Sequence, residues 1–269
     1  MNKIKIVNDE VKQANIDDKV KYEIIPKNYF FDVTTLSIEV LENTTLILEY
    51  NTRKATKLNI KIKVLNDVNL DLIEYRYGKN FKVQYEYTLL KNSSTKVSKF
   101  YDVKGIKEMT IINLQEENAS INYNFKTISI GCEKYNMIIN HNSKLTNSNI
   151  INNAVNILKG NVSFNVSSFV TEHNINCNVI QNSRIVNLTN NKCQIKPNLF
   201  IDEYEVDAYH AAYIGNLDDN ELLYLKSRGI DTKTSEILLV NGFLTKEMPK
   251  YLISKIKRNI DKYWRVDCE

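Results

Sequence analysis

The residues best suited to metal binding or nucleophilic chemistry in this chain are histidines and cysteines, and they are few. The sequence contains three histidines and four cysteines. The cysteines form no CxxC pair, so their spacing predicts neither a zinc knuckle nor a disulfide framework. A site built from several imidazoles would need all the histidines, and their wide separation gives it no support. The full set is His141, His173, His210, Cys132, Cys177, Cys193 and Cys268.

The motifs of the common nucleotide-dependent and hydrolytic enzymes are absent. The sequence has no GxxxxGK[ST] loop, no GxGxxG after a strand, no HExxH and no GxSxG. An enzyme built on two carboxylates stays open, because the distance between acidic side chains cannot be read from sequence. The basic residues outnumber the acidic ones by 36 to 32 and are spread along the chain, so no nucleic-acid partner is expected.

Nothing in the sequence predicts insertion into a membrane. The first ten residues are charged from Lys3 onward and contain no apolar run typical of a signal peptide. No later stretch approaches the roughly 18 apolar residues that a membrane helix requires. We therefore expect a cytoplasmic protein whose thiols stay reduced.

The elements that position these residues are predicted by a hydrophobic period of two between about residues 44 and 200. Segments 58–64 and 81–89 alternate strictly between apolar and polar residues, as half-buried strands do. No helical period interrupts this region, so a sheet with helical crossovers is not expected. A sandwich, a barrel and a solenoid remain.

Asparagine favours the solenoid among these three. Residues 140–198 contain 17 asparagines among 59 residues, mostly flanking short Ile, Val or Phe strands. Asparagine tolerates left-handed turn conformations and stacks in side-chain ladders between successive strands, which the corners of a parallel β-solenoid require. A sandwich of hairpins remains the alternative, because no strict repeat length is visible.

After Pro197 the pattern changes from strands to capped helices. Aspartates and threonines precede short apolar segments, and glycines follow them, as at helix ends. We expect one helix from Asp218 or Asp219 to Gly229, a second from Asp231 or Thr232 to near Gly242, and a third opened by Thr245 with Pro249 in its first turn. The predicted division is an N-terminal extension, partly strand (1–43), a β-helix core (44–210) and a C-terminal helical domain (211–269).

The segment 196–243 carries an ordered set of motifs. It begins with Lys-Pro-x-Leu at Lys196, continues with His-x-Ala at His210 and with Gly215, and ends with Leu-x-Tyr-Leu-x-Ser-Arg-Gly from Leu222 and Gly-Phe at Gly242. This set resembles the C-terminal signature of the SufB/SufD family of iron–sulfur cluster assembly proteins. Weaker similarity extends back to about residue 135.

The resemblance implies a fold and a set of partners. Members of the family have a right-handed parallel β-helix core followed by a C-terminal helical domain. They pair through their β-helices, as SufB with SufD or as homodimers, and their C-terminal helices dock the ABC ATPase SufC. A nascent iron–sulfur cluster forms where the two β-helices meet, so the resemblance implies a transient cluster and no tightly bound cofactor.

Two positions make the sequence resemble SufD more than SufB. The SufB type carries a cysteine nine positions before the motif histidine and a glutamate just after that histidine. Here those positions are Ile201 and Ala211. Ala211 also differs from the glycine usual in SufD, and the family's long N-terminal helical region has no counterpart in this sequence. The dimer partner is therefore either a SufB-like paralogue or a second copy of this chain. The type of cluster and the involvement of a reduced flavin also stay open.

The resemblance also assigns candidate roles to individual residues. His210 is the candidate ligand of iron or of the cluster, since a neutral imidazole binds iron, and Cys193 and Cys177 are weaker candidates as thiolates. Packing within the protein is the alternative for each. The candidate ATPase-docking residues are Leu222, Tyr224, Arg228, Gly229 and Phe243; for Leu222 and Phe243 internal packing is the favoured interpretation, and Arg228 with Gly229 equally fit a helix C-cap.

Two other functions compete with the scaffold hypothesis. A carbohydrate-active β-solenoid protein would use asparagines and the 16 tyrosines to line a sugar-binding groove. It would also carry a secretory signal, which the sequence does not predict. A family member that supports assembly but no longer binds a cluster is the second, and substitution of His210 would distinguish it.

Overall fold

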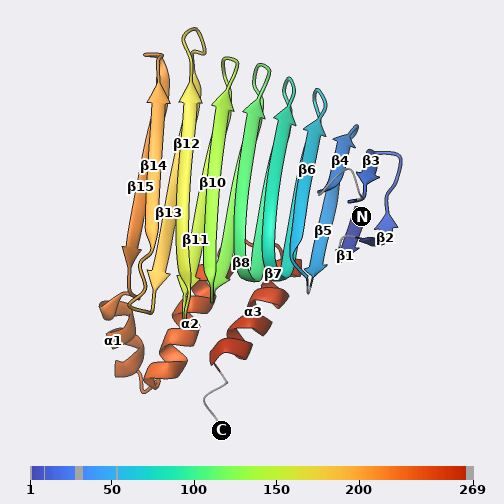
Figure 1. Cartoon of the computed structure of the whole chain (residues 1–269). Helices are drawn as coiled ribbons and strands as arrows, with labels where there is room; N and C mark the ends of the chain where they lie inside the picture. The colour runs from blue at the N-terminus through green and yellow to red at the C-terminus, as the bar shows by residue number, and fades with distance from the viewer. Residues whose placement is uncertain (1, 9, 28–32, 53, 265–269) are drawn as a thin grey trace.

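The computed structural model describes residues 2–8, 10–27, 33–52 and 54–264. It consists of strands followed by helices at the C-terminus (Figure 1). The strands are β1 (Asn2–Val7), β2 (Glu10–Asn15), β3 (Val20–Ile25), β4 (Thr34–Val40), β5 (Thr44–Thr52), β6 (Thr56–Val64), β7 (Asn69–Leu89), β8 (Ser94–Leu114), β9 (Ser120–Ser129), β10 (Cys132–His141), β11 (Asn147–Asn156), β12 (Asn161–Val170), β13 (Cys177–Asn187), β14 (Gln194–Ile201) and β15 (Val206–Gly215). The helices are α1 (Asp219–Ser227), α2 (Thr232–Thr245) and α3 (Lys250–Trp264).

The strands form a parallel β-solenoid, which confirms the preferred prediction over the sandwich. One side of each coil joins β5, β7, β8, β9, β11, β13 and β15 in parallel, and the other joins β4, β6, β7, β8, β10, β12 and β14. We call these the first sheet and the second sheet. The long strands β7 and β8 bend at a corner and contribute to both sheets (Figure 1).

The length of one coil changes along the chain, which explains why no strict repeat is visible in the sequence. Residues paired in register are 24 positions apart between Thr34 and Leu58 and 31 positions apart between Asn147 and Asn178. The extra residues lie in the corners, where asparagines such as Asn118 and Asn176 adopt positive φ angles of 61° and 57°. Corners that grow in length leave the strand register intact while they destroy the sequence period.

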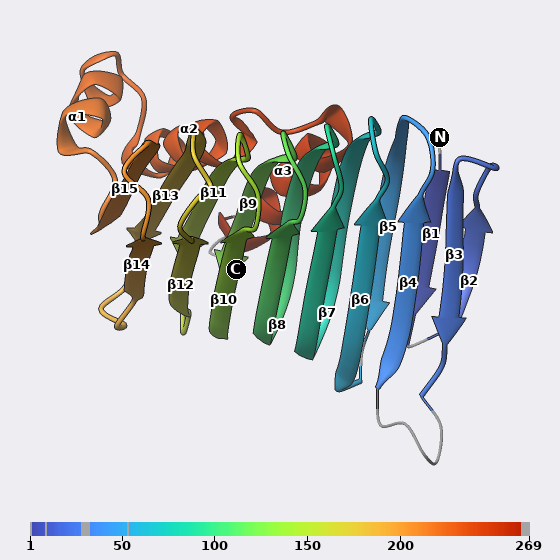
Figure 2. The same ribbon diagram turned by 90° about the horizontal axis from the view of Figure 1, so that it is seen from above.

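The two ends of the solenoid differ. At the N-terminal end, β2 pairs antiparallel with β1, and β3 pairs antiparallel with β4, so short antiparallel strands cover the first coils (Figure 2). At the other end, β14 pairs only with β12 and β15 only with β13 among the described residues. β15 runs to Gly215 and α1 begins at Asp219, so the change from strand to helix lies at residues 216–218. The N-terminal segment belongs to the stack too, since β1 and β4 pair in parallel with β5 and β6.

The helix caps follow the predicted residues at the first two helices. Asp218 caps α1 by accepting from the backbone N–H groups of Asn220 and Glu221, and Asp231 caps α2. The second helix continues past its predicted end near Gly242, and the third begins at Lys250 rather than at Thr245. A single glycine does not end a helix whose next turn is buried, and Leu244 is fully buried. No helix in the described part of the chain is both long and apolar enough to cross a membrane.

Helices α2 and α3 cover the outer face of the first sheet and leave the second sheet bare (Figure 2). Apolar residues on that outer face pack against the helices in one cluster, which joins Ile47, Ile73, Phe100, Val155 and Val186 of the strands to Val240, Leu244, Leu252, Ile256 and Ile260 of the helices. Polar contacts add to this cluster, because Tyr251 donates to Glu49 and Tyr263 donates to Asp102 at 2.8 Å.

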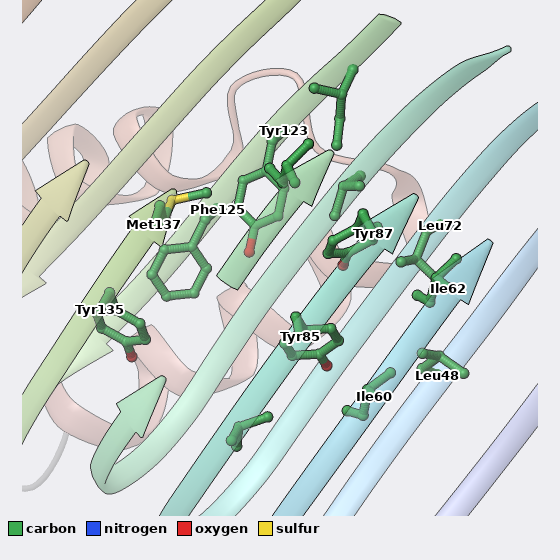
Figure 3. Packing of buried hydrophobic residues seen from close by; sticks show 14 of the residues in the cluster. Leu48, Ile60, Ile62, Leu72, Tyr85, Tyr87, Tyr123, Phe125, Tyr135 and Met137 are labelled. Carbon is green, nitrogen blue, oxygen red and sulfur yellow. The ribbon is translucent and has the colours of Figure 1, made fainter. Parts of the chain in front are cut away.

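The interior of the solenoid is filled by in-register rows of apolar and aromatic side chains (Figure 3). Tyr85 and Tyr87 are stacked with ring centroids 5.7 Å apart, and Phe125 lies 4.7 Å from Tyr135. Six of the sixteen tyrosines that a sugar-binding groove could use are inside, since Tyr50, Tyr85, Tyr87, Tyr101, Tyr123 and Tyr135 are all at most 4% exposed.

Four charged side chains are also buried in the interior and pair with one another. The Arg76 guanidinium lies 2.8 Å from Glu74, and the Lys99 ammonium lies 3.4 Å from Glu74 and 3.6 Å from Glu108. Burial alone would raise the pKa of Glu74, but the Lys99 and Arg76 cations together hold that pKa below its usual range. The Tyr101 hydroxyl lies 3.0 Å from Glu74 and 2.8 Å from Glu108, within donating distance of either carboxylate with its one proton. Two cations and two carboxylates thus balance one another away from water.

Glu133 is buried next to this group without a cation. One carboxyl oxygen accepts from the Tyr135 hydroxyl at 2.7 Å and from the Thr127 hydroxyl at 3.0 Å, and the other has no hydrogen-bond partner among the described residues. Burial raises the pKa of Glu133 to about 8, so the folded protein holds this side chain protonated at neutral pH.

We predict that Glu133→Gln is tolerated at neutral pH and stabilises the protein in alkaline solution. The folded pKa lies above the unfolded one, so wild-type stability falls as pH rises from about 4.5 to 8, by up to a few kcal/mol. An amide does not titrate, so the variant should lack this fall. Urea unfolding at several pH values measures it; parallel curves for the two proteins would contradict the assignment.

Candidate functional site

The last coil is formed by β14 and β15, and β15 is the most exposed strand of the parallel stack. We call it the terminal coil. Eight of the ten residues of β15 are exposed, whereas β13, its neighbour in the first sheet, is mostly buried. The difference arises because nothing stacks on the terminal coil among the described residues, so its strand edges and core-facing side chains stay uncovered. Such an edge is a template for pairing with another chain.

His210 occupies a core-facing position of this uncovered layer. In the parallel register it lies over Gln181, which is 1% exposed, while Ala208 and Ala212 lie over the buried residues Val179 and Ser183. Parallel in-register strands point equivalent side chains the same way, so His210 faces the solenoid axis and yet is exposed. The Gln181 amide donates to Ser168 at 2.7 Å, and its buried oxygen has no partner. A polar, coordinating side chain thus stands at the centre of an otherwise apolar open end.

The cysteines are not brought together with His210. Cys177 pairs in register with Val206, four residues from His210 along β15, which is about 13 Å of strand. Cys177 is buried, whereas Cys193, just before β14, is half-buried, and burial raises the pKa of its thiol. No cluster of three or more His, Cys, Asp or Glu side chains within the described residues could hold a metal ion.

Cys177 belongs instead to a buried hydrogen-bond chain that includes His141. The His141 ring lies 2.8 Å from the Thr146 hydroxyl and 2.9 Å from the Ser148 hydroxyl. The Thr146 oxygen in turn lies 3.1 Å from the Cys177 sulfur. Burial lowers the pKa of His141 to about 4, so its imidazole is neutral at physiological pH.

Helix α1 carries the second exposed surface that the sequence singled out. It contributes no buried residue, and Leu223 and Tyr224 are 67% and 59% exposed. The Arg228 guanidinium lies 5.2 Å from the centroid of the Tyr224 ring, so the two side chains form one surface. Gly229 follows with φ of 84°, and its N–H donates to the Lys226 carbonyl, so it is also the residue that ends the helix.

The other two predicted docking residues pack inside the protein. Leu222 is half-buried against the cluster between the helices and the first sheet, and so is Phe243. The Phe243 ring lies 5.3 Å from the Arg184 guanidinium and 5.7 Å from the Lys126 ammonium, which project from the sheet. These contacts fit the internal-packing interpretation of both residues. Leu223, which the sequence did not single out, is the exposed leucine.

Two features of the site were missed from the sequence. The hydrogen-bond chain from His141 to Cys177 could have been inferred in part from the sequence. Tyr135, Met137 and Ile139 precede His141 at a spacing of two, which assigns the His141 side chain to the interior. The uncovered state of the terminal coil has no local signal, because β15 alternates no differently from strands that are covered.

Comparison with known proteins finds similarity between this chain and iron–sulfur cluster assembly proteins. Residues 30–243 match the family model described as "SUF system FeS cluster assembly, SufBD core domain". The chain is 32% identical over 148 residues to the iron–sulfur cluster assembly protein SufD of Bacillus subtilis. This match covers 50% of this chain and 34% of that protein. It is 23% identical over 198 residues to SufD of Escherichia coli, covering 71% of this chain and 47% of that protein. A SufBD family protein of Mycobacterium leprae is 38% identical over 65 residues, 24% of this chain and 17% of that protein.

These matches span less than half the length of each relative. They include two proteins named SufD, which agrees with the SufD-like features at Ile201 and Ala211.

We predict that protonation of His141 destabilises the fold in mild acid. Its folded pKa of about 4 lies below the unfolded value of about 6.5, so stability falls as pH drops through this window, by up to about 3 kcal/mol. His141→Gln should lose this dependence and unfold at a more nearly constant denaturant concentration between pH 7 and pH 4. Chemical denaturation of both proteins across that range tests the assignment, and an unchanged difference between them would contradict it.

Proposed function

The chain belongs to the SufBD core family of iron–sulfur cluster assembly proteins, and on this premise we propose that it is a scaffold subunit of a Suf-type complex. In this role it catalyses no reaction itself. It pairs through its terminal coil, receives a nascent cluster there, and docks a SufC-like ATPase through its C-terminal helices in the cytoplasm. The cluster is the cargo of the complex and not a resident cofactor.

The uncovered terminal coil is the observation that carries this proposal. β15 offers a full row of unpaired backbone groups on one edge, and its core-facing residues are exposed. A second chain that adds its own edge would satisfy these groups and bury the apolar layer, which stabilises the pair. Two copies related by a twofold axis would meet through identical surfaces, and a SufB-like paralogue offers the same geometry with different side chains.

Pairing at this edge would also complete a metal site. His210 supplies one imidazole, and within the described residues no group of three or more His, Cys, Asp or Glu side chains could hold a metal ion. The partner chain supplies the remaining thiolates or carboxylates in this proposal. Assembly and release of the cluster would then depend on the distance between the terminal coils of the two chains. ATP hydrolysis by the docked subunit would change this distance.

The α1 surface of Leu223, Tyr224 and Arg228 supports ATPase docking. Exposed leucine and tyrosine side chains with an adjacent arginine have the composition of an interface hot spot. The helix contributes no buried side chain of its own, so its exposed face is available to a partner. It also follows directly after β15 (Figure 1), so in this proposal the ATPase would dock near the cluster site.

We predict that His210→Ala lowers the amount of cluster that the assembled complex holds. Anaerobic reconstitution with iron and sulfide should give at least a twofold loss of the visible absorption per dimer. His173→Ala, which removes an exposed corner histidine, is the matched control and should behave as wild type. Equal spectra for wild type and the two variants would exclude His210 from the site. Pairing is tested separately by sedimentation, and a chain that sediments as a monomer both with and without a SufB-like paralogue would contradict it.

We predict that Leu223→Asn weakens capture of the ATPase. Co-expression with a SufC-like subunit and affinity purification of this chain should recover several-fold less ATPase from the variant, because a central apolar anchor is lost. Leu158→Asn is the matched control, since Leu158 is also 67% exposed but lies in the corner between β11 and β12. Equal recovery from the two variants would exclude α1 as the docking helix.

A further inference from the structure

The bare outer face of the second sheet carries a row of lysines in register. Lys57 of β6 pairs with Lys82 of β7, Lys82 with Lys107 of β8, and Lys107 with Lys134 of β10. All four side chains are exposed. We call this set the lysine row. A second pair, Lys79 and Lys104, is also in register and exposed at the adjoining corner.

Three members of the row have no acidic partner. Lys82, Lys107 and Lys134 form no ion pair within the described part of the chain, whereas Lys61 and Lys63 on the same face pair with Glu86 and Glu39 at 3.8 and 3.1 Å. Like charges directly opposite each other on neighbouring strands destabilise a sheet. The row is therefore a cost to the free protein that an anionic ligand would relieve.

The surface beside the row is hollowed on both sides. One groove, of about 440 Å³, is lined by Lys57, Lys82 and Lys107 together with Asn80, Gly105 and Cys132. Another groove, of about 320 Å³, is lined by the same three lysines together with Gln84, Met109 and Asn136. Apart from the three lysines, two charged side chains line the grooves, Lys27 and the 4% exposed Glu108, and the other lining side chains are uncharged. The two hollows leave room for an elongated ligand that lies along the row.

The spacing of the charges selects the ligand. Adjacent strands are about 4.8 Å apart, so the four lysines span about 14 Å along the solenoid axis. On an α-helix, acidic residues at i, i+3, i+7 and i+10 rise by about 4.5 to 6 Å per step and span about 15 Å. Alternate residues of an extended strand are about 6.7 Å apart, and the phosphates of one DNA strand advance by about 3.4 Å, so both match less well.

The composition of the grooves also argues against nucleic acid. Phe81 is the single aromatic residue that lines either groove in the described part of the chain, and it is 4% exposed, so it offers no ring for stacking a base. The row contains no arginine, the side chain that binds phosphate through two parallel hydrogen bonds. We propose that the lysine row binds the acidic face of a helix from a partner protein, laid across the strands of the second sheet.

A designed peptide tests this with residues 1–269 and no other protein. The probe is a fluorescein-labelled helical peptide of about 18 residues with glutamates at i, i+3, i+7 and i+10, compared with a peptide of the same composition whose glutamates are distributed around the helix. Fluorescence anisotropy should show saturable binding of the first peptide, weaker binding of the second, and a loss of affinity as salt is added.

Charge-neutral variants identify the surface. Combining Lys82→Gln, Lys107→Gln and Lys134→Gln should weaken binding of the first peptide by about tenfold or more. The matched control combines Lys21→Gln, Lys61→Gln and Lys63→Gln, which removes the same charge from the same sheet face and should weaken binding much less. The first variant should unfold at the same or a higher temperature than wild type, because lysine–lysine repulsion is removed.

Cys132 provides an independent readout, because its exposed thiol lies in one of the grooves. In a background without Cys193 and Cys268, bound peptide should slow its alkylation by a neutral maleimide. Absence of binding, equal loss in the two triple variants, or equal affinity for the two peptides would overturn the proposal. So would tighter binding of a single-stranded oligonucleotide or of anionic lipid vesicles at matched salt, since either would replace the helix as the occupant.

Discussion

The structure depends on one constraint, the in-register parallel hydrogen bonding of each coil on the one before it. This pairing sets equivalent side chains one strand spacing apart, so every residue type repeats as a row along the solenoid. Asparagines use the constraint favourably, since Asn140 donates to Asn113 at 2.8 Å and Asn198 donates to Asn165 at 3.2 Å. Lysines cannot bond to one another in this way, and Lys82, Lys107 and Lys134 form no ion pair among the described residues. The same constraint leaves the last coil without a neighbour, because a parallel stack has no means of closing on itself.

The helices decide which surfaces remain for partners. Helices α2 and α3 bury the outer face of the first sheet, and antiparallel strands cover the N-terminal end of the solenoid. Three surfaces stay open: the terminal coil around His210, the exposed face of α1 and the lysine row of the second sheet. They point to different neighbours, because the first is an unpaired strand edge, the second is apolar with one arginine, and the third is basic. This separation is what the proposed scaffold role requires, since each proposed partner would bind a different surface.

The alternation of residues predicted strands at 58–64 and 81–89, but alternation alone does not assign the two faces of every strand, and β7 shows why. Apolar and charged residues alternate at positions 73–76 of this strand. In the structure α3 covers the outer face, so Ile73 packs there, and Glu74 and Arg76 turn inward, where Lys99 and Glu108 balance them. Both faces of this part of the strand are buried, so a rule that assumes one solvent-exposed face cannot assign its residues to the two faces. The same limit applies to His210, whose exposure depends on the absence of a further coil and not on its own strand.

The sequence by itself determined the strand alternation, the asparagine-rich corners, the helix caps at Asp218 and Asp231, and the motif set that identifies the family. These are local properties, set by backbone sterics and by hydrogen bonds between residues near one another in the chain. Only the tertiary structure decided the coil lengths, the burial of Glu74 and Glu133, the separation of His210 from the cysteines, and the alignment of Lys57, Lys82, Lys107 and Lys134. Each of these depends on register between strands 24 to 31 residues apart, and that register is fixed by the packing of the whole stack rather than by any one segment.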